Sequence, residues 1–319
     1  MKKILIIGGA GFIGFHLSKK LLKLGYKVDI LDNFSRGSLD THLKKLLKDK
    51  NSNLINLDIL NGNIKDKLSN DYFGIFHLAA IVGVQNVISH PYSVLEKNSI
   101  LTLKAISIAK NQKNLKKFLF ASTSEIYSKS IEILKAKIPT PENTSVVLTN
   151  PSNKRSTYFL TKIFGESLVH HSKLPFIIFR PHNIYGPRMG MSHVIPEIVF
   201  KLQKAKKNIS AYSASHTRSF CYIDDAVNQL IFMLSKSYVV KKTFNLGNQL
   251  EEISIKNLIK KIQTKMKKED IKIQFKIDNH GSQSRRCPDM SKLKLLYNFK
   301  TTSIDLGLNK TIKWYLKNK

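Results

Sequence analysis

The sequence predicts an α/β protein built on a doubly wound parallel sheet, with a smaller α/β lobe toward the C-terminus. Two observations predict this fold. Short apolar runs, with the length of buried strands, alternate with helical periodicities from the start of the chain to about residue 180. The first run, residues 3–7, leads into a turn in which Gly8, Gly11 and Gly14 are spaced three apart, and a helix is predicted over residues 15–24.

The glycine-rich turn indicates a dinucleotide site. One glycine permits the tight bend, a second lets the backbone approach a pyrophosphate, and a third lets helix and strand pack closely. The N-terminus of the helix then offers free N–H groups and a partial positive charge to the phosphates. The strand predicted over residues 27–31 ends at Asp32, about 20 residues on, where a carboxylate accepts hydrogen bonds from a ribose. Together these features predict a Rossmann-like nucleotide-binding sheet rather than an ordinary turn.

Strands and helices continue to alternate after Asp32. Further strands are predicted at residues 53–57, 75–80, 118–121 and 176–180, and helices at 94–110 and 157–171. Beyond about residue 180, strands and helices alternate less regularly. Helices are predicted there at residues 194–204, 224–234, 255–267 and 305–316, between loops and short strands. The expected organisation is a nucleotide-binding domain over residues 1–180 and a substrate-binding lobe over residues 181–319, with segments that can interleave.

The composition is that of a globular protein. No apolar run approaches the roughly 18 residues that a membrane span needs. The N-terminal lysines precede only four apolar residues before Gly8, which does not match a signal peptide. The two cysteines, Cys221 and Cys287, provide neither a disulfide framework nor a zinc cluster. We therefore expect a cytoplasmic protein with no membrane contact and no metal site.

The net charge is +31, from 53 basic and 22 acidic residues, which raises the question of a nucleic-acid partner. The lysines are spread through nearly every predicted helix, and dense runs such as residues 256–268 match solvated helix faces. Net charge informs on solubility and non-specific attraction rather than on a specific site. Nucleic acid is therefore not the expected partner, whereas an anionic, diphosphate-bearing substrate suits so positive a surface.

Tyr158 and Lys162 form the strongest catalytic pattern. At positions i and i+4 of a helix, a phenol and an ammonium share one face. A nearby cation favours the phenolate, which makes Tyr158 useful as a general base near neutral pH. Tyr238 and Tyr315 also precede a lysine by four residues, but the first lies between a predicted helix and a strand, and the second lies close to the C-terminus.

Hydroxyl groups and a carboxylate follow the strand predicted to end at residue 121. Ligands of open α/β sheets bind outside the carboxyl ends of the strands, so Ser122, Thr123, Ser124 and Glu125 are expected to face the site. A hydroxyl there can hydrogen-bond a substrate hydroxyl while Tyr158 takes its proton. For the two serines, the alternative is that they only satisfy the backbone of the turn.

With these residues in place, the chain resembles the extended short-chain dehydrogenases/reductases of the nucleotide-sugar epimerase/dehydratase/decarboxylase family over essentially its whole length. The motifs that carry this resemblance are the glycine turn, Asp32-Asn33-Phe34, Asp58, His77-Leu78-Ala79-Ala80, Asn98, the run from Thr123 to Tyr127, Tyr158 with Lys162, the run from Arg180 to Pro187, Arg218-Ser219-Phe220, Phe244-Asn245-Leu246-Gly247 and Arg285-Arg286. They are specific to the family, but not to one substrate.

The resemblance implies NAD as cofactor and a nucleotide-diphosphate sugar as substrate. The implied cofactor-binding residues are Gly8, Gly11, Phe12, Ile13, Gly14, Asp32, Asn33, Asp58, Ile59, Leu78, Ala79, Ala80, Asn98, Tyr158 and Lys162. The implied catalytic residues are Thr123, Glu125, Tyr158 and Lys162. The implied substrate-binding residues are Ser124, Asn183, Arg218, Arg285 and Arg286. Guanidinium groups bind phosphate in a bidentate way, although Arg285 and Arg286 could instead be surface charge.

Three positions depart from the family pattern. Ser128 stands where many members have glycine, and Phe15 replaces a small polar residue after the third glycine. Arg36 lies close enough to Asp32 to raise the question of a 2′-phosphate on the cofactor. A carboxylate would repel that phosphate, so NAD is preferred.

The family shares a first step, hydride transfer from the sugar, commonly at C4, to NAD⁺, which leaves a 4-keto intermediate. A C4 epimerase is the preferred interpretation, because residues 217–225 and 285–292 resemble epimerases more closely. A UDP-glucuronate-type decarboxylase is the second, because Glu125 is typical of decarboxylases and dehydratases. A 4,6-dehydratase is the third, because Ser124 stands where many dehydratases carry an acid.

A non-enzymatic alternative is an NAD-binding or RNA-associated scaffold, which the basic charge would suit. The presence of Thr123, Tyr158 and Lys162 together argues against it. The resemblance also implies a homodimer, formed through the helices predicted at residues 94–110 and 157–171, and a role in polysaccharide or glycoconjugate precursor synthesis.

Overall fold

The computed structural model describes the whole chain except residues 62–63, 65–66, 149, 277–282 and 319. The chain forms two compact units. The first consists of Met1–Lys129, Val146–Arg180 and Val227–Phe244, and the second of Ser130–Ser145, Pro181–Ala226 and Asn245–Lys319.

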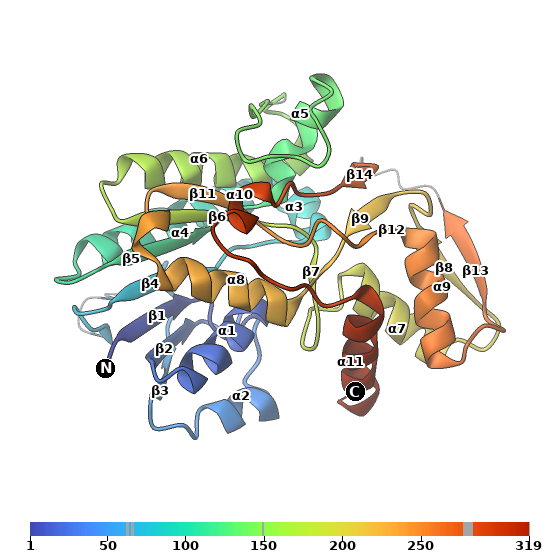
Figure 1. Cartoon of the computed structure of the whole chain (residues 1–319), viewed down its shortest axis with the longest axis horizontal. Coiled ribbons are helices and arrows are strands. Elements are labelled where there is room, and N and C mark those ends of the chain that lie inside the picture. Colours follow the sequence, from blue (N-terminus) through green and yellow to red (C-terminus); the bar gives the residue numbers. More distant parts are fainter. Residues whose placement is uncertain (62–63, 65–66, 149, 277–282, 319) are drawn as a thin grey trace. The chain divides into compact units, whose positions relative to one another are not determined.

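A seven-stranded sheet forms the core of the first unit, in the order β11-β6-β5-β4-β1-β2-β3 (Figure 1). The strands are β1 (Lys3–Ile7), β2 (Lys27–Asp32), β3 (Ser52–Asn56), β4 (Gly74–His77), β5 (Lys117–Ala121), β6 (Phe176–Pro181) and β11 (Lys242–Leu246). The pairs from β3 through β1 to β6 are parallel, which confirms the predicted doubly wound sheet. Its order reverses at β1, so the carboxyl ends of β1 and β4 form the switch point where such sheets bind ligands.

Helices cover both faces of this sheet, because its strands are apolar on both sides. The helices and 3-10 turns of the first unit are α1 (Phe12–Lys23), α2 (Thr41–Leu46), α3 (Val84–Ser89), α4 (Pro91–Lys110), η2 (Ser124–Tyr127), η3 (Lys154–Ser156), α6 (Thr157–His171) and η4 (Ser237–Val239). Two helices have residues in both units: α5 (Ser128–Ile133) and α8 (Ile223–Ser235). Helices α4 and α6 lie side by side on one face (Figure 1).

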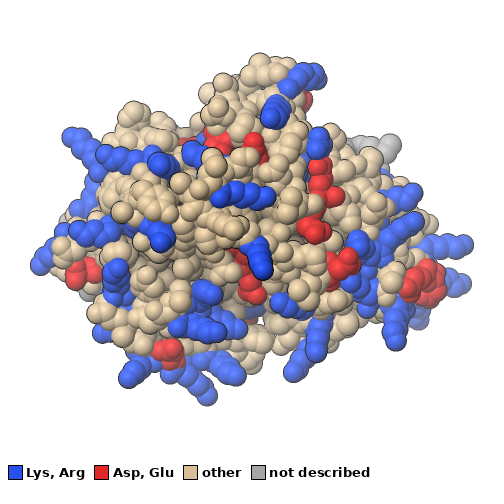
Figure 2. Space-filling view, viewed as in Figure 1, with Lys and Arg blue, Asp and Glu red and all other residues tan. Residues whose placement is uncertain are grey.

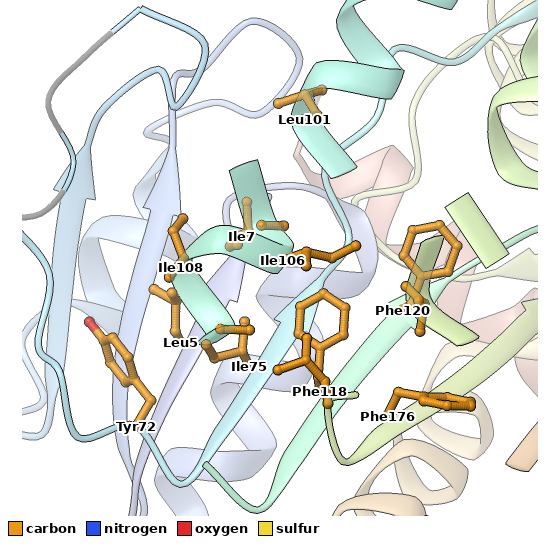
Figure 3. Close-up of a cluster of buried hydrophobic side chains, with 14 of the residues drawn as sticks. Leu5, Ile7, Tyr72, Ile75, Leu101, Ile106, Ile108, Phe118, Phe120 and Phe176 are labelled. Carbon is orange, nitrogen blue, oxygen red and sulfur yellow. The ribbon is translucent and has the colours of Figure 1, made fainter. Parts of the chain in front are cut away.

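The main apolar core lies between the sheet and these two helices (Figure 3). Leu5, Ile75 and Phe118 come from the strands, whereas Ile106 comes from α4. Helix α6 approaches β5 closely because Gly165 has no side chain. A Cβ at that position would lie 2.5 Å from the ring of Phe120.

The second unit is built from short strands and helices. The strands are β7 (Ile184–Tyr185), β8 (Asn208–Tyr212), β9 (Thr217–Ser219), β10 (Cys221–Tyr222), β12 (Glu252–Ser254), β13 (Lys272–Lys276) and β14 (Arg285–Arg286). They form three small sheets: β10-β7, β12-β9-β14 and β13-β8. The helices α7 (Val194–Lys204), α9 (Ile255–Met266) and α11 (Ile304–Lys317) contact one another, and α10 (Ser291–Lys294) is short. Ser254 and Ser303 cap α9 and α11 by accepting hydrogen bonds from backbone N–H groups.

Three features of the surface and composition bear on function. Lysine and arginine side chains are spread over most of the visible face (Figure 2). Among the described residues, no helix combines the length and the apolar character required to cross a membrane. Both cysteines are buried free thiols.

Candidate cofactor and catalytic site

The glycine turn brings the end of β1 and the start of α1 too close together for any side chain. A Cβ on Gly14 would lie 2.5 Å from the carbonyl oxygen of Gly8. Gly8 has a φ of +85°, and a Cβ there would lie 2.7 Å from the backbone nitrogen of Ala79. No side chain caps α1, so the backbone N–H groups of its first turn are left for a ligand.

Asp32 connects the glycine turn to the end of β2. Its buried carboxylate accepts hydrogen bonds from the backbone N–H of Ala10 at 3.0 Å and of Phe34 at 2.9 Å. At the end of β3, Asp58 accepts a hydrogen bond from the side chain of Asn33 at 3.0 Å. The predicted ribose and adenine residues therefore meet at one edge of the sheet.

The segment after β4 closes the other side of the turn. The backbone N–H groups of Leu78 and Ala79 both donate to the carbonyl of Ile7 at 2.9 Å, so the chain leaves the sheet at this point. The side chain of Asn98 holds the next turn through two hydrogen bonds to the backbone of Ile81, at 2.7 and 3.0 Å.

These features fit a dinucleotide. A cradle that only glycine can form, an uncapped helix N-terminus and a buried carboxylate on the adjacent strand all lie in one unit. Phe12 and Ile13 form the first turn of α1, and Ile59 is buried just after β3.

Tyr158 opens α6 opposite the end of β5. Burial and the charge of Glu125 raise the pKa of Tyr158, whereas a hydrogen bond with Thr123 and the charge of Arg36 lower it. The net pKa is raised, so the phenol is neutral in the chain by itself. Thr123, Glu125 and Arg36 therefore all lie within electrostatic reach of the predicted base.

Lys162 lies one helical turn further along α6. Its Nζ donates a hydrogen bond to the carbonyl of Ala121 at 2.8 Å and lies 6.0 Å from the ring centre of Tyr158. Burial lowers the pKa of Lys162 to about 8, although the charge of Glu166 raises it. The sequence predicts that a nearby cation favours the phenolate, whereas the chain alone keeps Tyr158 protonated.

The residues between β5 and α5 form the 3-10 turn η2. Thr123 caps this turn by accepting a hydrogen bond from the N–H of Glu125 at 3.2 Å. Ser124 is buried, and so is Ser122, whose Oγ has no hydrogen-bond partner among the described residues. Ser122 therefore does not use its hydroxyl to satisfy the turn.

Residues that sequence reasoning did not assign also lie here. The sequence singled out Arg36 only for its proximity to Asp32, yet its charge acts on Tyr158. His77, at the end of β4, is fully buried, and burial followed by the charge of Lys162 lowers its pKa to about 3. Glu166 follows Tyr158 and Lys162 at the same four-residue spacing, which is the signal that could have identified it.

The candidate phosphate-binding residues lie in the second unit. In the parallel pair β9–β14, Arg286 is the register partner of Arg218. The guanidinium of Arg218 donates to the carbonyls of Thr217 and Ser284 at 2.7 and 3.1 Å. Arg285 instead forms a two-bond pair with Glu252, at 2.7 and 2.9 Å.

Asn183 has a φ of +41°, and its side chain donates to the carbonyl of Ser219, next to Arg218, at 3.2 Å. Asn183 and Arg218 are therefore held together within the second unit. No group of three or more His, Cys, Asp or Glu side chains within the described parts of the chain could hold a metal ion.

Comparison with known proteins finds a matching family model and similar proteins that match this chain over nearly its whole length. A family model described as the NAD dependent epimerase/dehydratase family matches residues 4–247. A UDP-N-acetyl-alpha-D-glucosaminuronate decarboxylase of Bacillus cytotoxicus is 32% identical over 98% of this chain and 98% of its own length. UDP-glucuronic acid decarboxylase 1 of Xenopus tropicalis is 29% identical over 99% of this chain and 72% of that protein.

Among solved structures, the UDP-glucuronic acid 4-epimerase of Bacillus cereus, in complex with UDP-glucuronic acid and NAD, superposes with a TM-score of 0.87. It is 27% identical, and the match covers 99% of this chain and 100% of the epimerase.

Proposed function

The chain belongs to the NAD dependent epimerase/dehydratase family, whose chemistry is NAD-dependent conversion of nucleotide sugars, and we propose that it oxidises a UDP-hexuronic acid at C4 and then decarboxylates it. The observation that carries the proposal is the place of Glu125 on η2, where its N–H donates to the Thr123 hydroxyl at 3.2 Å and its charge acts on the Tyr158 phenol. A C4 epimerase needs no acid at that position.

The chemistry follows from the substrate. When bound, NAD⁺ would supply the hydride acceptor for oxidation of the sugar at C4. Tyr158, in its deprotonated form, takes the proton of the C4 hydroxyl, and Thr123 holds that oxygen by a hydrogen bond. The product is a β-keto acid. The C5–C6 bond then breaks, carbon dioxide leaves, and the electron pair moves to the C4 oxygen as an enolate.

The protein then completes the cycle. The protonated Tyr158 and Thr123 stabilise the enolate by hydrogen bonding, as donors aimed at a developing oxyanion do. We assign Glu125 to the delivery of a proton to C5, which it first takes up from solvent, because decarboxylation of the ionised acid consumes one proton. With the hydride back on C4 and the Tyr158 proton returned to the C4 oxygen, the product would be a UDP-pentose, and the cofactor would undergo no net change.

Sequence reasoning ranked epimerisation first and decarboxylation second. Two observations favour the reverse order: the coupling of Glu125 to Tyr158, and the two decarboxylases among the relatives. C4 epimerisation is the second candidate, favoured by the similarity to the Bacillus cereus UDP-glucuronic acid 4-epimerase. The two decarboxylases and the Bacillus cereus epimerase described above are all named for sugars with a carboxyl group at C6, which supports a hexuronate as the substrate.

We further propose that Arg218 and Arg286 bind the substrate diphosphate, because register pairing sets these two cations side by side. A second copy of the chain is the proposed partner, contacting α4 and α6, where Ile100, Leu103 and Phe164 are exposed. The free buried thiols suit a cytoplasmic location. The biological role that we propose for this reaction is the synthesis of precursors for polysaccharides.

The test is product analysis. Purified protein is incubated with NAD⁺ and UDP-glucuronic acid, UDP-N-acetylglucosaminuronic acid, UDP-glucose and dTDP-glucose, with Tyr158→Phe as control. Loss of carbon dioxide from a uronic acid, seen by mass spectrometry after chromatography that resolves isomers, is the expected result. An isomer of unchanged mass would identify an epimerase, and loss of water would identify a dehydratase. Either outcome would overturn the proposed reaction.

A further inference from the structure

Buried side chains of the first unit form a hydrogen-bond network on the elements that carry the candidate catalytic residues. Arg180 is the penultimate residue of β6, and its side chain is only 7% exposed. Its guanidinium donates to both carboxylate oxygens of Glu166, at 2.9 and 2.6 Å. Its remaining terminal nitrogen donates to the hydroxyl of Tyr127 at 2.7 Å.

Each member of this network belongs to an element that carries a candidate catalytic residue or ends beside one. Tyr127 is the last residue of η2, two residues after Glu125. Glu166 lies on α6, one turn after Lys162 and two turns after Tyr158. The carboxyl end of β6 lies next to that of β5, because Ala121 and Phe179 are register partners.

The segment from Ala121 to Tyr127 is consequently attached to α6 at both of its ends. At one end, Lys162 donates to the carbonyl of Ala121 at 2.8 Å. At the other end, Tyr127 is joined to Glu166 through Arg180. Thr123 and Glu125 lie between these two attachments.

Stability alone explains this network poorly. Burying an ion pair costs desolvation energy that is often not recovered, and well-packed apolar groups of similar volume frequently do as well. A bidentate arginine pair instead supplies directional hydrogen bonds that fix geometry. Catalytic groups need such supports, because a displacement of about 1 Å can reduce a rate by about a hundredfold.

We propose that Tyr127, Arg180 and Glu166 are positioning residues that set the placement of Glu125 relative to Tyr158. The contact of Arg180 with Tyr127 governs the step after oxidation of the sugar rather than the binding of NAD. This second statement rests on the proposed function, whereas the positioning of η2 does not.

Tyr127→Phe tests the proposal, because it removes a single hydroxyl and keeps the buried ring. Tyr72→Phe is the matched control. The hydroxyl of Tyr72 is also buried and donates to a carboxylate, that of Asp29, at 2.5 Å. Asp29 keeps its ion pair with Lys3 at 2.8 Å, so the control variant retains a paired carboxylate.

The first measurement is hydrogen–deuterium exchange of peptides covering residues 122–128, which requires no substrate. Tyr127→Phe is expected to increase exchange in this segment, whereas Tyr72→Phe leaves it as in the wild type. Glu166→Gln, which removes the charge of the pair, is expected to act in the same direction as Tyr127→Phe. Unchanged exchange in both network variants overturns the proposal, whatever the rates do.

The second measurement is a single turnover followed by NADH absorbance. Tyr127→Phe is expected to form NADH at close to the wild-type rate and to lose it about tenfold more slowly, because Glu125 is displaced. The dissociation constant for NAD stays within about twofold of the wild type. A variant that matches Tyr72→Phe in this trace overturns the assignment to the later step.

The two proposals fail in different ways. If the wild type converts none of the UDP-sugars, the proposed function falls, and the exchange experiment still decides the positioning role. If the wild type decarboxylates a uronic acid and Tyr127→Phe exchanges and reacts like Tyr72→Phe, only the network proposal falls.

Discussion

The carboxylate of Asp32 accepts a hydrogen bond from the backbone N–H of Ala10 at 3.0 Å. The residue predicted to hold the ribose of NAD therefore also fixes the turn predicted to receive the pyrophosphate. One side chain would thus serve both halves of the proposed cofactor site, and two substitutions can separate these roles.

Asp32→Asn keeps an oxygen that can accept from Ala10 but removes the charge that the ribose hydroxyls meet. We expect it to weaken NAD binding by about tenfold, equivalent to about 1.4 kcal/mol. Asp32→Ala also loses the support of the turn, so it is expected to weaken binding further and to lower the melting temperature. Isothermal titration with NAD⁺ and thermal unfolding measure these effects. Equal affinities of Asp32→Asn and the wild type would contradict the ribose role.

Tyr158→Phe is expected to reduce sugar oxidation by about a hundredfold to ten-thousandfold, the usual contribution of a positioned acid–base group. NAD binding is expected to persist, because Lys162 is unchanged. Tyr238→Phe is the matched control, since Tyr238 also precedes a lysine by four residues but lies 49% exposed in η4. NADH formation with a UDP-hexuronic acid is the readout. Similar losses in the two variants would remove Tyr158 from the mechanism.

Glu166→Gln is expected to move the alkaline limit of sugar oxidation to lower pH. Burial lowers the pKa of Lys162 to about 8, and the charge of Glu166 opposes that shift. Without that charge, Lys162 loses its proton at a lower pH, and the cation that favours the Tyr158 phenolate disappears earlier. The initial rate of NADH formation between about pH 6 and pH 10 measures the shift. Glu96→Gln, at an exposed glutamate of α4, is the control, and identical profiles would refute the coupling.

Arg286→Met is expected to raise the KM for the UDP-sugar by about tenfold or more, because a charge-assisted hydrogen bond contributes about 1.5–3 kcal/mol. Arg285→Met is expected to have a smaller effect, since Glu252 already engages that guanidinium at 2.7 Å. Steady-state kinetics and inhibition by UDP compare the two variants. A larger effect at Arg285 would reverse the assignment.

The wild type is expected to sediment as a dimer, and a variant with Leu103→Glu and Phe164→Glu as a monomer. These two side chains are 47% and 45% exposed on α4 and α6, where a charge would oppose burial against a second copy. Leu250→Glu, at a leucine that is 69% exposed in the second unit, is the control. A wild-type mass near 36.4 kDa would exclude the dimer.

Local patterns predicted much of the sheet. The apolar runs of β1, β2, β5 and β6 and the glycine turn can be recognised within a few residues, because strand burial and turn geometry are local properties. The fourth strand was predicted to reach residue 80 but ends at His77. The residues after His77 are also apolar, because the chain there packs beside Gly8. The backbone of Leu78 and Ala79, however, no longer follows the hydrogen-bond pattern of the sheet.

Long-range features could not be predicted in the same way. Strand β11 joins the sheet beside β6 although about 60 residues separate them, and nothing in its short sequence specifies that neighbour. Tyr315 lies close to the C-terminus, and its side chain is buried on α11. Its position in the sequence did not predict that burial.

In the candidate site, too, local sequence patterns predict some residues and long-range contacts determine the others. The sequence predicts roles for Asp32, Thr123, Tyr158 and Lys162 because each lies at a strand end or at a helical spacing. It gave no role to Arg180, whose contacts with Tyr127 and Glu166 join three distant parts of the chain.

The double attachment of residues 121–127 to α6 has a consequence for engineering. Ser124 and Glu125 lie between the two attachments, and the cofactor cradle is formed by other strands. Exchanging these two side chains should therefore redirect the fate of a common ketone, toward epimer, pentose or dehydrated sugar, without rebuilding the nucleotide site. A library restricted to these two positions is the smallest one in which to search for a change of product.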